Sequence, residues 1–126
     1  MIFNDYRAWL KDKKQNTQQM IYMKDFDSPL DFWAKYYSFE GSIKVLMPKI
    51  YVHDRELYER DIIKSDKQLY VVRYSVSVGA FVAELARDPF YIFLLPDIIQ
   101  KAEIVGNLYE DYEKIKVMLN EWKRKK

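Results

Sequence analysis

The single histidine of this chain stands beside a carboxylate, in the pair His53-Asp54. A histidine oriented by an acid can act as a general base. The sequence contains one histidine, no cysteine and no Gly-x-Ser-x-Gly turn, so the pair lacks the companions that zinc sites, two-histidine nucleases or serine hydrolases need. We therefore expect His53 to lie in a surface turn. The sequence predicts no catalytic residue, and the chain is interpreted as a protein that is not an enzyme.

Four carboxylates fall within eight residues around this pair, and a hard cation such as magnesium binds groups of this kind. Bases interrupt the cluster, and Glu56 and Arg60 have the spacing of an ordinary surface ion pair on a helix. The sequence favours a solvated charged segment without a metal ligand. Its carboxylates and interleaved bases are Asp54, Glu56, Glu59, Asp61, Arg55, Arg60 and Lys64. The three glycines stand alone and far apart, so no phosphate-binding loop and no cofactor is expected.

Two features bear on nucleic acid. The last four residues are Lys123, Arg124, Lys125 and Lys126, and since the net charge is +2, the remaining residues sum to +2 − 4 = −2. This tip can contact a phosphate backbone weakly, but the favoured interpretation is that its cations complement a helix C-terminus. In the alternating segment 69–78, Tyr70 and Tyr74 fall on the face opposite Arg73, which favours core or interface packing over base stacking.

Composition indicates one folded domain spanning residues 1–126. Apolar residues make up 49% of the chain and charged residues 32%, which excludes a disordered chain. No uncharged stretch is long enough to cross a bilayer, and Asp5 and Arg7 interrupt any secretory signal. With no cysteine, disulfides and thiolate metal sites are excluded, and we expect an intracellular protein.

The first half of the chain predicts two helices and two strands. Tyr6, Trp9 and Leu10 share one side of a predicted helix over 4–14, and 20–23 is a candidate edge strand. Ser28-Pro29 caps a second helix that ends near 40, before Gly41. The β-branched run 43–52 predicts a strand in which the proline favours an edge or a bulge.

The second half predicts two further strands. The charged connector 53–67 is interpreted as a helical turn or a short strand, and 69–78 alternates as a strand with one wet face. Residues 79–87 fit a short helix or a continued strand. The apolar run 90–95, between two prolines, predicts a central strand covered on both faces.

From 97 to 125 apolar residues recur every three or four positions, which predicts one long C-terminal helix. At about 1.5 Å per residue it would reach about 43 Å, beyond a domain of roughly 36 Å. Either it breaks at Gly106-Asn107, or its overhanging face contacts a second copy in a homodimer. The predicted interface residues are Tyr109, Tyr112, Ile115, Leu119 and Trp122.

These elements together predict an α+β domain, in which a small, mostly antiparallel sheet is covered by helices near 4, 29 and 97. The abundance of lysine, glutamate and tyrosine without cysteine resembles the composition of small proteins from hyperthermophilic archaea and their viruses. The resemblance implies a thermophilic setting and carries no site residue. The predicted function is self-association as an interaction or structural protein. The alternative is a nucleic-acid-binding accessory protein that uses the basic tip.

Overall fold

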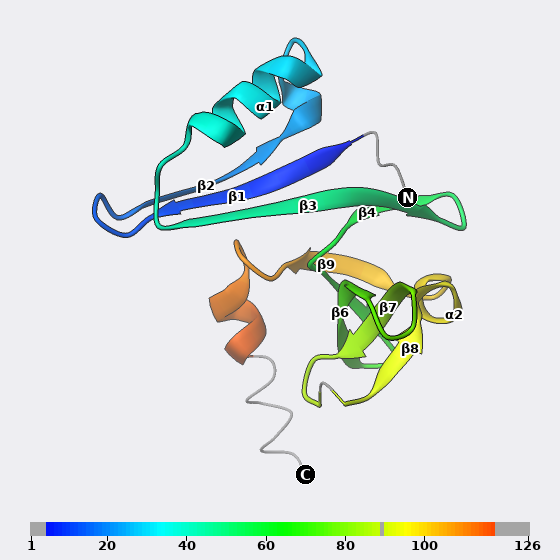
Figure 1. Cartoon of the computed structure of the whole chain (residues 1–126). Coiled ribbons are helices and arrows are strands. Elements are labelled where there is room, and N and C mark those ends of the chain that lie inside the picture. The colour runs from blue at the N-terminus through cyan, green and yellow to red at the C-terminus, as the bar shows by residue number, and fades with distance from the viewer. Residues whose placement is uncertain (1–4, 89, 118–126) are drawn as a thin grey trace. The chain divides into compact units, whose positions relative to one another are not determined.

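The computed structural model describes residues 5–88 and 90–117, and strands dominate it (Figure 1). Two antiparallel sheets carry the strand orders β2-β1-β3-β4 and β8-β7-β6-β5-β9. The helices within this part of the chain are short. The predicted α+β sheet covered by helices is therefore wrong, because the helix predicted over 4–14 is a strand and the helix predicted over 97–125 is interrupted by a strand at 103–107. The chain divides into two compact units, residues 1–50 and 51–126.

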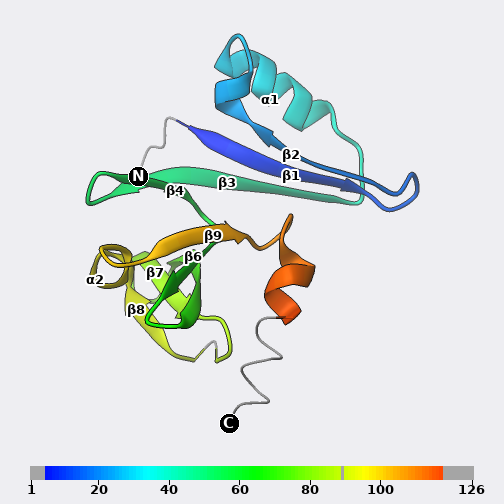
Figure 2. The same cartoon turned by 180° about the vertical axis from the view of Figure 1, so that it is seen from behind.

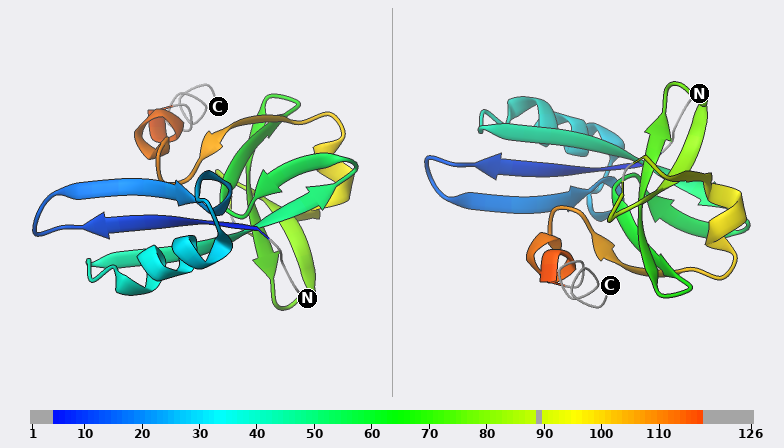
Figure 3. Two further views of the ribbon diagram at one scale, coloured as in Figure 1. Left: turned by 90° about the horizontal axis from the view of Figure 1, so that it is seen from above. Right: turned by 90° about the horizontal axis from the view of Figure 1, so that it is seen from below.

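The first unit is built on three strands and one helix. β1 (Tyr6–Asp12) pairs on one side with β2 (Thr17–Tyr22) and on the other with β3 (Ile43–Val52), both antiparallel. A single turn of 3-10 helix, η1 (Met23–Asp25), leads from β2 toward α1 (Pro29–Ser38). Figure 3 shows α1, in cyan, lying across one face of these strands.

The helix α1 forms where the sequence predicts it. The Ser28 side chain accepts a hydrogen bond from the Asp31 backbone N–H at 3.3 Å, and Pro29 occupies the first helical position. Phe32 is fully buried beneath the helix in the core of this unit. That core also contains Ala8, Leu10, Ile21 and Met23. Burial of Phe32 therefore fixes the helix on the sheet.

The predicted helix over 4–14 is wrong, because this segment is the central strand β1 of the first unit. Ala8 and Leu10 lie on the face covered by α1, whereas Trp9 lies on the other face, and all three are buried. Burial on both faces removes the polar positions that mark an alternating strand. The apolar positions Tyr6, Trp9 and Leu10 consequently have the three- and four-residue spacing that is typical of a helix.

The second unit is a meander of four strands followed by a returning fifth strand. The meander consists of β5 (Asp61–Ser65), β6 (Gln68–Ser75), β7 (Ala80–Leu85) and β8 (Ile92–Leu94). The short helix α2 (Leu95–Ile99) then leads to β9 (Glu103–Asn107), which pairs with the free edge of β5 through a register shift (Figure 2).

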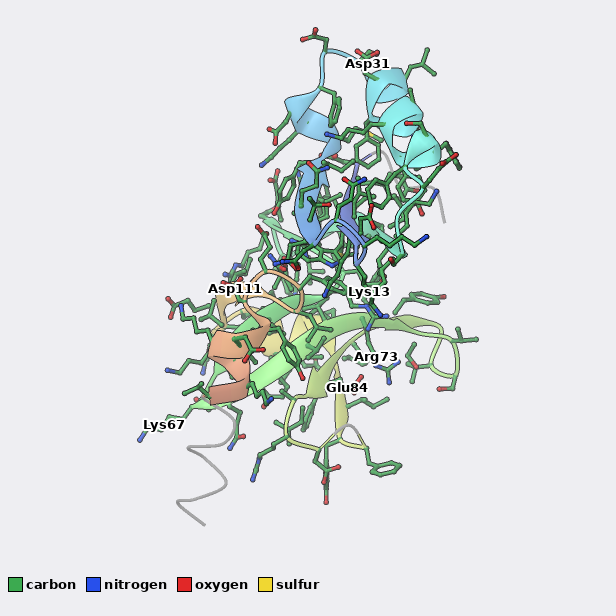
Figure 4. All side chains as sticks on the ribbon, turned by 90° about the vertical axis from the view of Figure 1, so that its left-hand side faces the viewer. Lys13, Asp31, Lys67, Arg73, Glu84 and Asp111 are labelled. Carbon is green, nitrogen blue, oxygen red and sulfur yellow. The ribbon has the colours of Figure 1, made fainter. Side chains whose placement is uncertain are left out.

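Tight turns formed without glycine join several of these strands. Between β3 and β4 (Arg55–Tyr58), His53 and Asp54 both have positive φ angles, of 50° and 63°. Between β5 and β6, Asp66 and Lys67 have φ angles of 50° and 66°, as a two-residue hairpin turn of type I′ requires. Figure 4 shows the Lys67 side chain at the tip of its hairpin. The connector 53–67 therefore forms strands joined by strained turns, and it contains no helix.

The long C-terminal helix is also wrong. α2 ends at Ile99, β9 occupies 103–107, and helix resumes over 112–117. The alternative of a helix broken at Gly106-Asn107 is wrong as well, because both residues belong to the strand β9. Asp111 accepts a hydrogen bond from the Asn107 N–H at 2.9 Å, and a Cβ on Gly106 would lie 2.5 Å from the Asp111 carboxylate. Within the described part of the chain, no helix has the length and apolarity to cross a membrane.

Candidate interaction surface

The strand β8 belongs to the most continuously apolar run of the chain, Phe90-Tyr91-Ile92-Phe93-Leu94-Leu95. A turn at Asp88 returns this run toward β7. The Asp88 side chain accepts from the Phe90 N–H at 3.2 Å, and its backbone carbonyl accepts from the Tyr91 N–H at 3.0 Å. The run ends where α2 begins with Leu95 and Pro96, and Leu95 is fully buried. Both ends of β8 are thereby held.

The position of β8 contradicts the prediction of a central, doubly covered strand. β8 is the edge of the five-stranded sheet, and it pairs only with β7 within the described chain. Phe93 keeps 42% of its surface exposed, Leu94 48% and Phe90 94%. A run whose composition is typical of a buried strand therefore lies at a sheet edge with its large side chains in contact with solvent.

The hydrogen bonds between β7 and β8 determine which backbone groups face outward. Leu85 N–H donates to the Tyr91 carbonyl at 2.9 Å, and the register continues as Glu84 opposite Ile92 and Ala83 opposite Phe93. In an antiparallel ladder, opposed residues alternate between hydrogen-bonded and non-hydrogen-bonded pairs. The N–H and C=O of Ile92 therefore point away from β7, toward the open edge.

The side chains around β8 differ between the two faces of the sheet. On one face, the Phe93 ring meets Tyr70 edge to face at 5.8 Å between centroids, and Tyr74 meets Phe81 in the same manner at 5.3 Å. On the other face, Arg73 pairs with Glu84, as Figure 4 shows. Arg73 thus lies on the other face of the sheet from Tyr70 and Tyr74, as the alternation of residues predicts, and Glu84 neutralises its charge.

The predicted interface residues that lie within the described part of the chain differ in burial. Ile115 is 5% exposed and packs with Ile62 and Leu69 in the core of the second unit. Tyr112 is exposed, and Tyr109 is partly buried. Leu119 and Trp122 lie outside the described residues, as do Lys123, Arg124, Lys125 and Lys126, so contact of this tip with nucleic acid stays a prediction.

Two of the carboxylates near His53 accept hydrogen bonds from different backbone N–H groups. Glu59 accepts a hydrogen bond from the Tyr74 N–H at 3.0 Å, and buried Asp61 accepts from the Tyr58 N–H at 2.8 Å. Arg55 donates to the carbonyls of Ile99, at 2.7 Å, and Ala102, where α2 ends. Over residues 5–88 and 90–117, no three metal-ligating side chains gather in one place.

The first unit carries a second exposed apolar feature on α1. Leu30 is 76% exposed, and the rings of Trp33 and Tyr37 stack at 5.8 Å between centroids. Lys44 Nζ lies 4.6 Å from the Tyr36 ring centroid and donates to the Tyr36 carbonyl at 3.2 Å. Burial, with a smaller contribution from the charge of Tyr37, raises the pKa of the Tyr36 hydroxyl.

An open depression of about 510 Å³ adjoins the end of α1. It is lined by side chains of mixed charge and polarity from α1, the loop that follows it and the β1–β2 turn, among them Asp12, Lys35 and Glu40. These groups do not define one ligand chemistry. The edge at β8 is therefore the stronger candidate site.

The exposed edge position of Ile92, Phe93 and Leu94 is not predicted above, although the run contains a usable signal. Proline occurs in sheets mainly at edges and strand ends, and Pro89 and Pro96 bound this run on both sides. A short apolar run between two prolines therefore fits an edge strand as well as a central one.

Comparison with known proteins does not assign a family. No family model matches the chain, and no curated protein matches it. Among solved structures, the chain is similar to the protein yopX from Bacillus subtilis, with a TM-score of 0.44 and 17% sequence identity. The match covers 90% of this chain and 96% of that chain. Similarity at this level carries no information about function.

Proposed function

We propose that this chain is a self-associating interaction protein without catalytic activity, and that its copies meet at the edge strand β8. One observation carries the proposal: the apolar run 90–95 lies at an open sheet edge, with Phe93 and Leu94 about half exposed. The contact is thus assigned to β8 in place of the C-terminal helix.

The physical reason is the cost of leaving such an edge in water. Natural proteins protect sheet edges with short strands, proline, charged side chains, bulges or a covering segment. β8 is short and its run is flanked by two prolines, but the run 90–95 carries no charged residue and keeps large apolar side chains exposed. Contiguous exposed apolar surface marks sites of protein interaction, and a two-fold contact is the commonest way for identical chains to cover one. A homodimer is the assembly that these arguments support.

A pair of leucine variants tests the proposal. Leu94→Lys places a charge on the edge strand, whereas Leu30→Lys places the same charge on α1, where the leucine is also exposed. Multi-angle light scattering coupled to size exclusion measures the mass over a range of protein concentrations. We expect the wild type and Leu30→Lys to reach twice 15.3 kDa as concentration rises, and Leu94→Lys to remain at 15.3 kDa.

Two results would contradict the proposal. A wild type that stays at 15.3 kDa at millimolar concentration would remove self-association altogether. A dimer that Leu30→Lys disrupts and Leu94→Lys leaves intact would assign the contact to α1. Circular dichroism of each variant controls for loss of fold.

The alternative function is nucleic acid binding by the basic tip, and the effect of salt distinguishes it from self-association. Binding to phosphates weakens steeply as salt concentration rises, whereas burial of an uncharged edge does not.

For the compartment, we propose the cell interior, supported by the absence of cysteine from the sequence.

A further inference from the structure

We infer that two copies join by antiparallel pairing of their β8 strands, with Ile92 opposite Ile92 of the second copy, so that two five-stranded sheets become one continuous sheet. This inference rests on the proposed self-association and specifies its geometry. The occupant of the open edge is a second copy of this chain.

The backbone supports strand pairing at this position. The Tyr91 carbonyl accepts from Leu85 of β7, and the Tyr91 N–H donates to the Asp88 carbonyl. The alternation of the ladder directs the groups of Phe93 toward β7 and leaves the N–H and C=O of Ile92 at the open edge. Backbone pairing requires residues whose groups face outward on both strands. A two-fold axis through the Ile92 pair satisfies this condition, because each Ile92 then donates one hydrogen bond and accepts one.

The side chains are self-complementary in this register. Counting outward from the Ile92 pair, Tyr91 falls opposite Phe93 of the second copy, and Phe90 falls opposite Leu94. Opposed residues in an antiparallel pair share a face of the sheet, and aromatic pairs across strands are favourable. The strongly exposed Phe90 ring and the half-exposed Leu94 side chain would therefore cover each other across the interface.

The sequence of the edge segment presents no electrostatic barrier to the pairing. No charged side chain lies between Asp88 and Asp97, so the paired segments bring no like charges into direct opposition. Pro89 and Pro96 bound the segment and limit the number of residues that can pair. The contact is therefore short, and its affinity depends on both backbone bonds and aromatic contacts.

A proline substitution tests the backbone part of the inference. Ile92→Pro removes the outward N–H and leaves the hydrogen bonds of Tyr91 and Phe93 to β7 available, and proline is tolerated where the N–H of an edge strand faces solvent. The matched control Ile92→Val keeps this N–H. We expect Ile92→Val to dimerise like the wild type. The dissociation constant of the Ile92→Pro dimer, measured by sedimentation equilibrium, should be at least tenfold higher.

A cysteine substitution tests the register, and it remains informative if the proline variant fails to fold. The chain contains no cysteine, so Ile92→Cys introduces a single thiol. Directly opposed hydrogen-bonded residues have Cα atoms about 5.5 Å apart, and their Cβ atoms lie at the wide end of the range for opposed pairs, at about 5.5 Å, which is beyond the reach of a disulfide. A short bismaleimide bridges two thiols over a longer distance, so it should convert most of Ile92→Cys to a covalent dimer, whereas Leu30→Cys, exposed on α1, should remain mainly monomeric at the same dilution.

The outcomes separate this inference from the proposed function. If Ile92→Pro dimerises as tightly as Ile92→Val, or if Ile92→Cys cross-links no faster than Leu30→Cys, the pairing is wrong. A wild type that still dimerises, and a Leu94→Lys variant that does not, would then leave the proposed function intact. A monomeric wild type would overturn both.

Discussion

Ile115 provides the sharpest test of how the C-terminal segment is used, because the sequence predicts it in an interface and the structure buries it. Ile115→Ala removes three carbons from a side chain that is 5% exposed and packs against Ile62 and Leu69. At about 0.8 kcal/mol per buried methylene, the lost transfer free energy is about 2.4 kcal/mol. The cavity raises the expected loss of unfolding free energy to about 3 kcal/mol.

The matched control lies two residues further along the same helical segment. Val117 is 55% exposed, so Val117→Ala should change the unfolding free energy by less than about 0.5 kcal/mol. Urea unfolding followed by circular dichroism measures both variants, and light scattering should give the same mass for each as for the wild type. Equal stability of the two variants, or a loss of dimer in Ile115→Ala without loss of stability, would refute the assignment of Ile115 to the core.

Three further predictions concern backbone conformation and pH. Lys67→Gly should raise the unfolding free energy by up to about 1 kcal/mol, because glycine adopts a φ of 66° without strain, whereas Lys64→Gly in the adjacent strand should lower it by a similar amount. Thermal melting measures both variants, and equal losses of stability would contradict the positive φ at Lys67. Gly41→Ala should cost about 1 to 3 kcal/mol, since a Cβ there would lie 2.3 Å from the Phe39 ring, and an unchanged urea midpoint would refute this contact. The pKa of Tyr36 is raised in the fold, so the contribution of this hydroxyl to stability is complete below pH 10 and is lost as the pH rises through the pKa of the folded protein. The urea midpoint of Tyr36→Phe should therefore fall less steeply above pH 10 than that of the wild type. Parallel declines of the two proteins would contradict this prediction.

The sequence predicts an element well where local chemistry marks its boundary. Ser28 and Pro29 determine the start of α1, and the structure places the helix over 29–38. The strands at 43–52 and 69–78 are predicted from β-branched and alternating residues. β3 occupies the first segment, and β6 occupies the second as far as Ser75, after which residues 76–78 form a turn. In these cases the signal lies within a few neighbouring residues.

Prediction fails where long-range pairing decides the conformation. Residues 6–12 form a strand that is buried on both faces, and residues 103–107 form a strand because they pair with the free edge of β5. Neither segment contains the information about its pairing partner. The candidate interaction surface could be predicted only in part. The apolar character of 90–95 is evident in the sequence, but its place at the edge depends on the order in which five strands assemble. A conflict between composition and position of this kind is typical of functional sites.

The central claim is that β8 is the contact between copies, and hydrogen exchange of two neighbouring amides tests it most directly. In a single copy, the Ile92 N–H faces the open edge, whereas the Phe93 N–H faces β7. Exchange measured by NMR at increasing protein concentration should show the Ile92 amide becoming protected as dimer forms, with Phe93 protected throughout. An Ile92 amide that exchanges equally fast at every concentration, while the mass rises from 15.3 kDa to twice that value, would contradict the account.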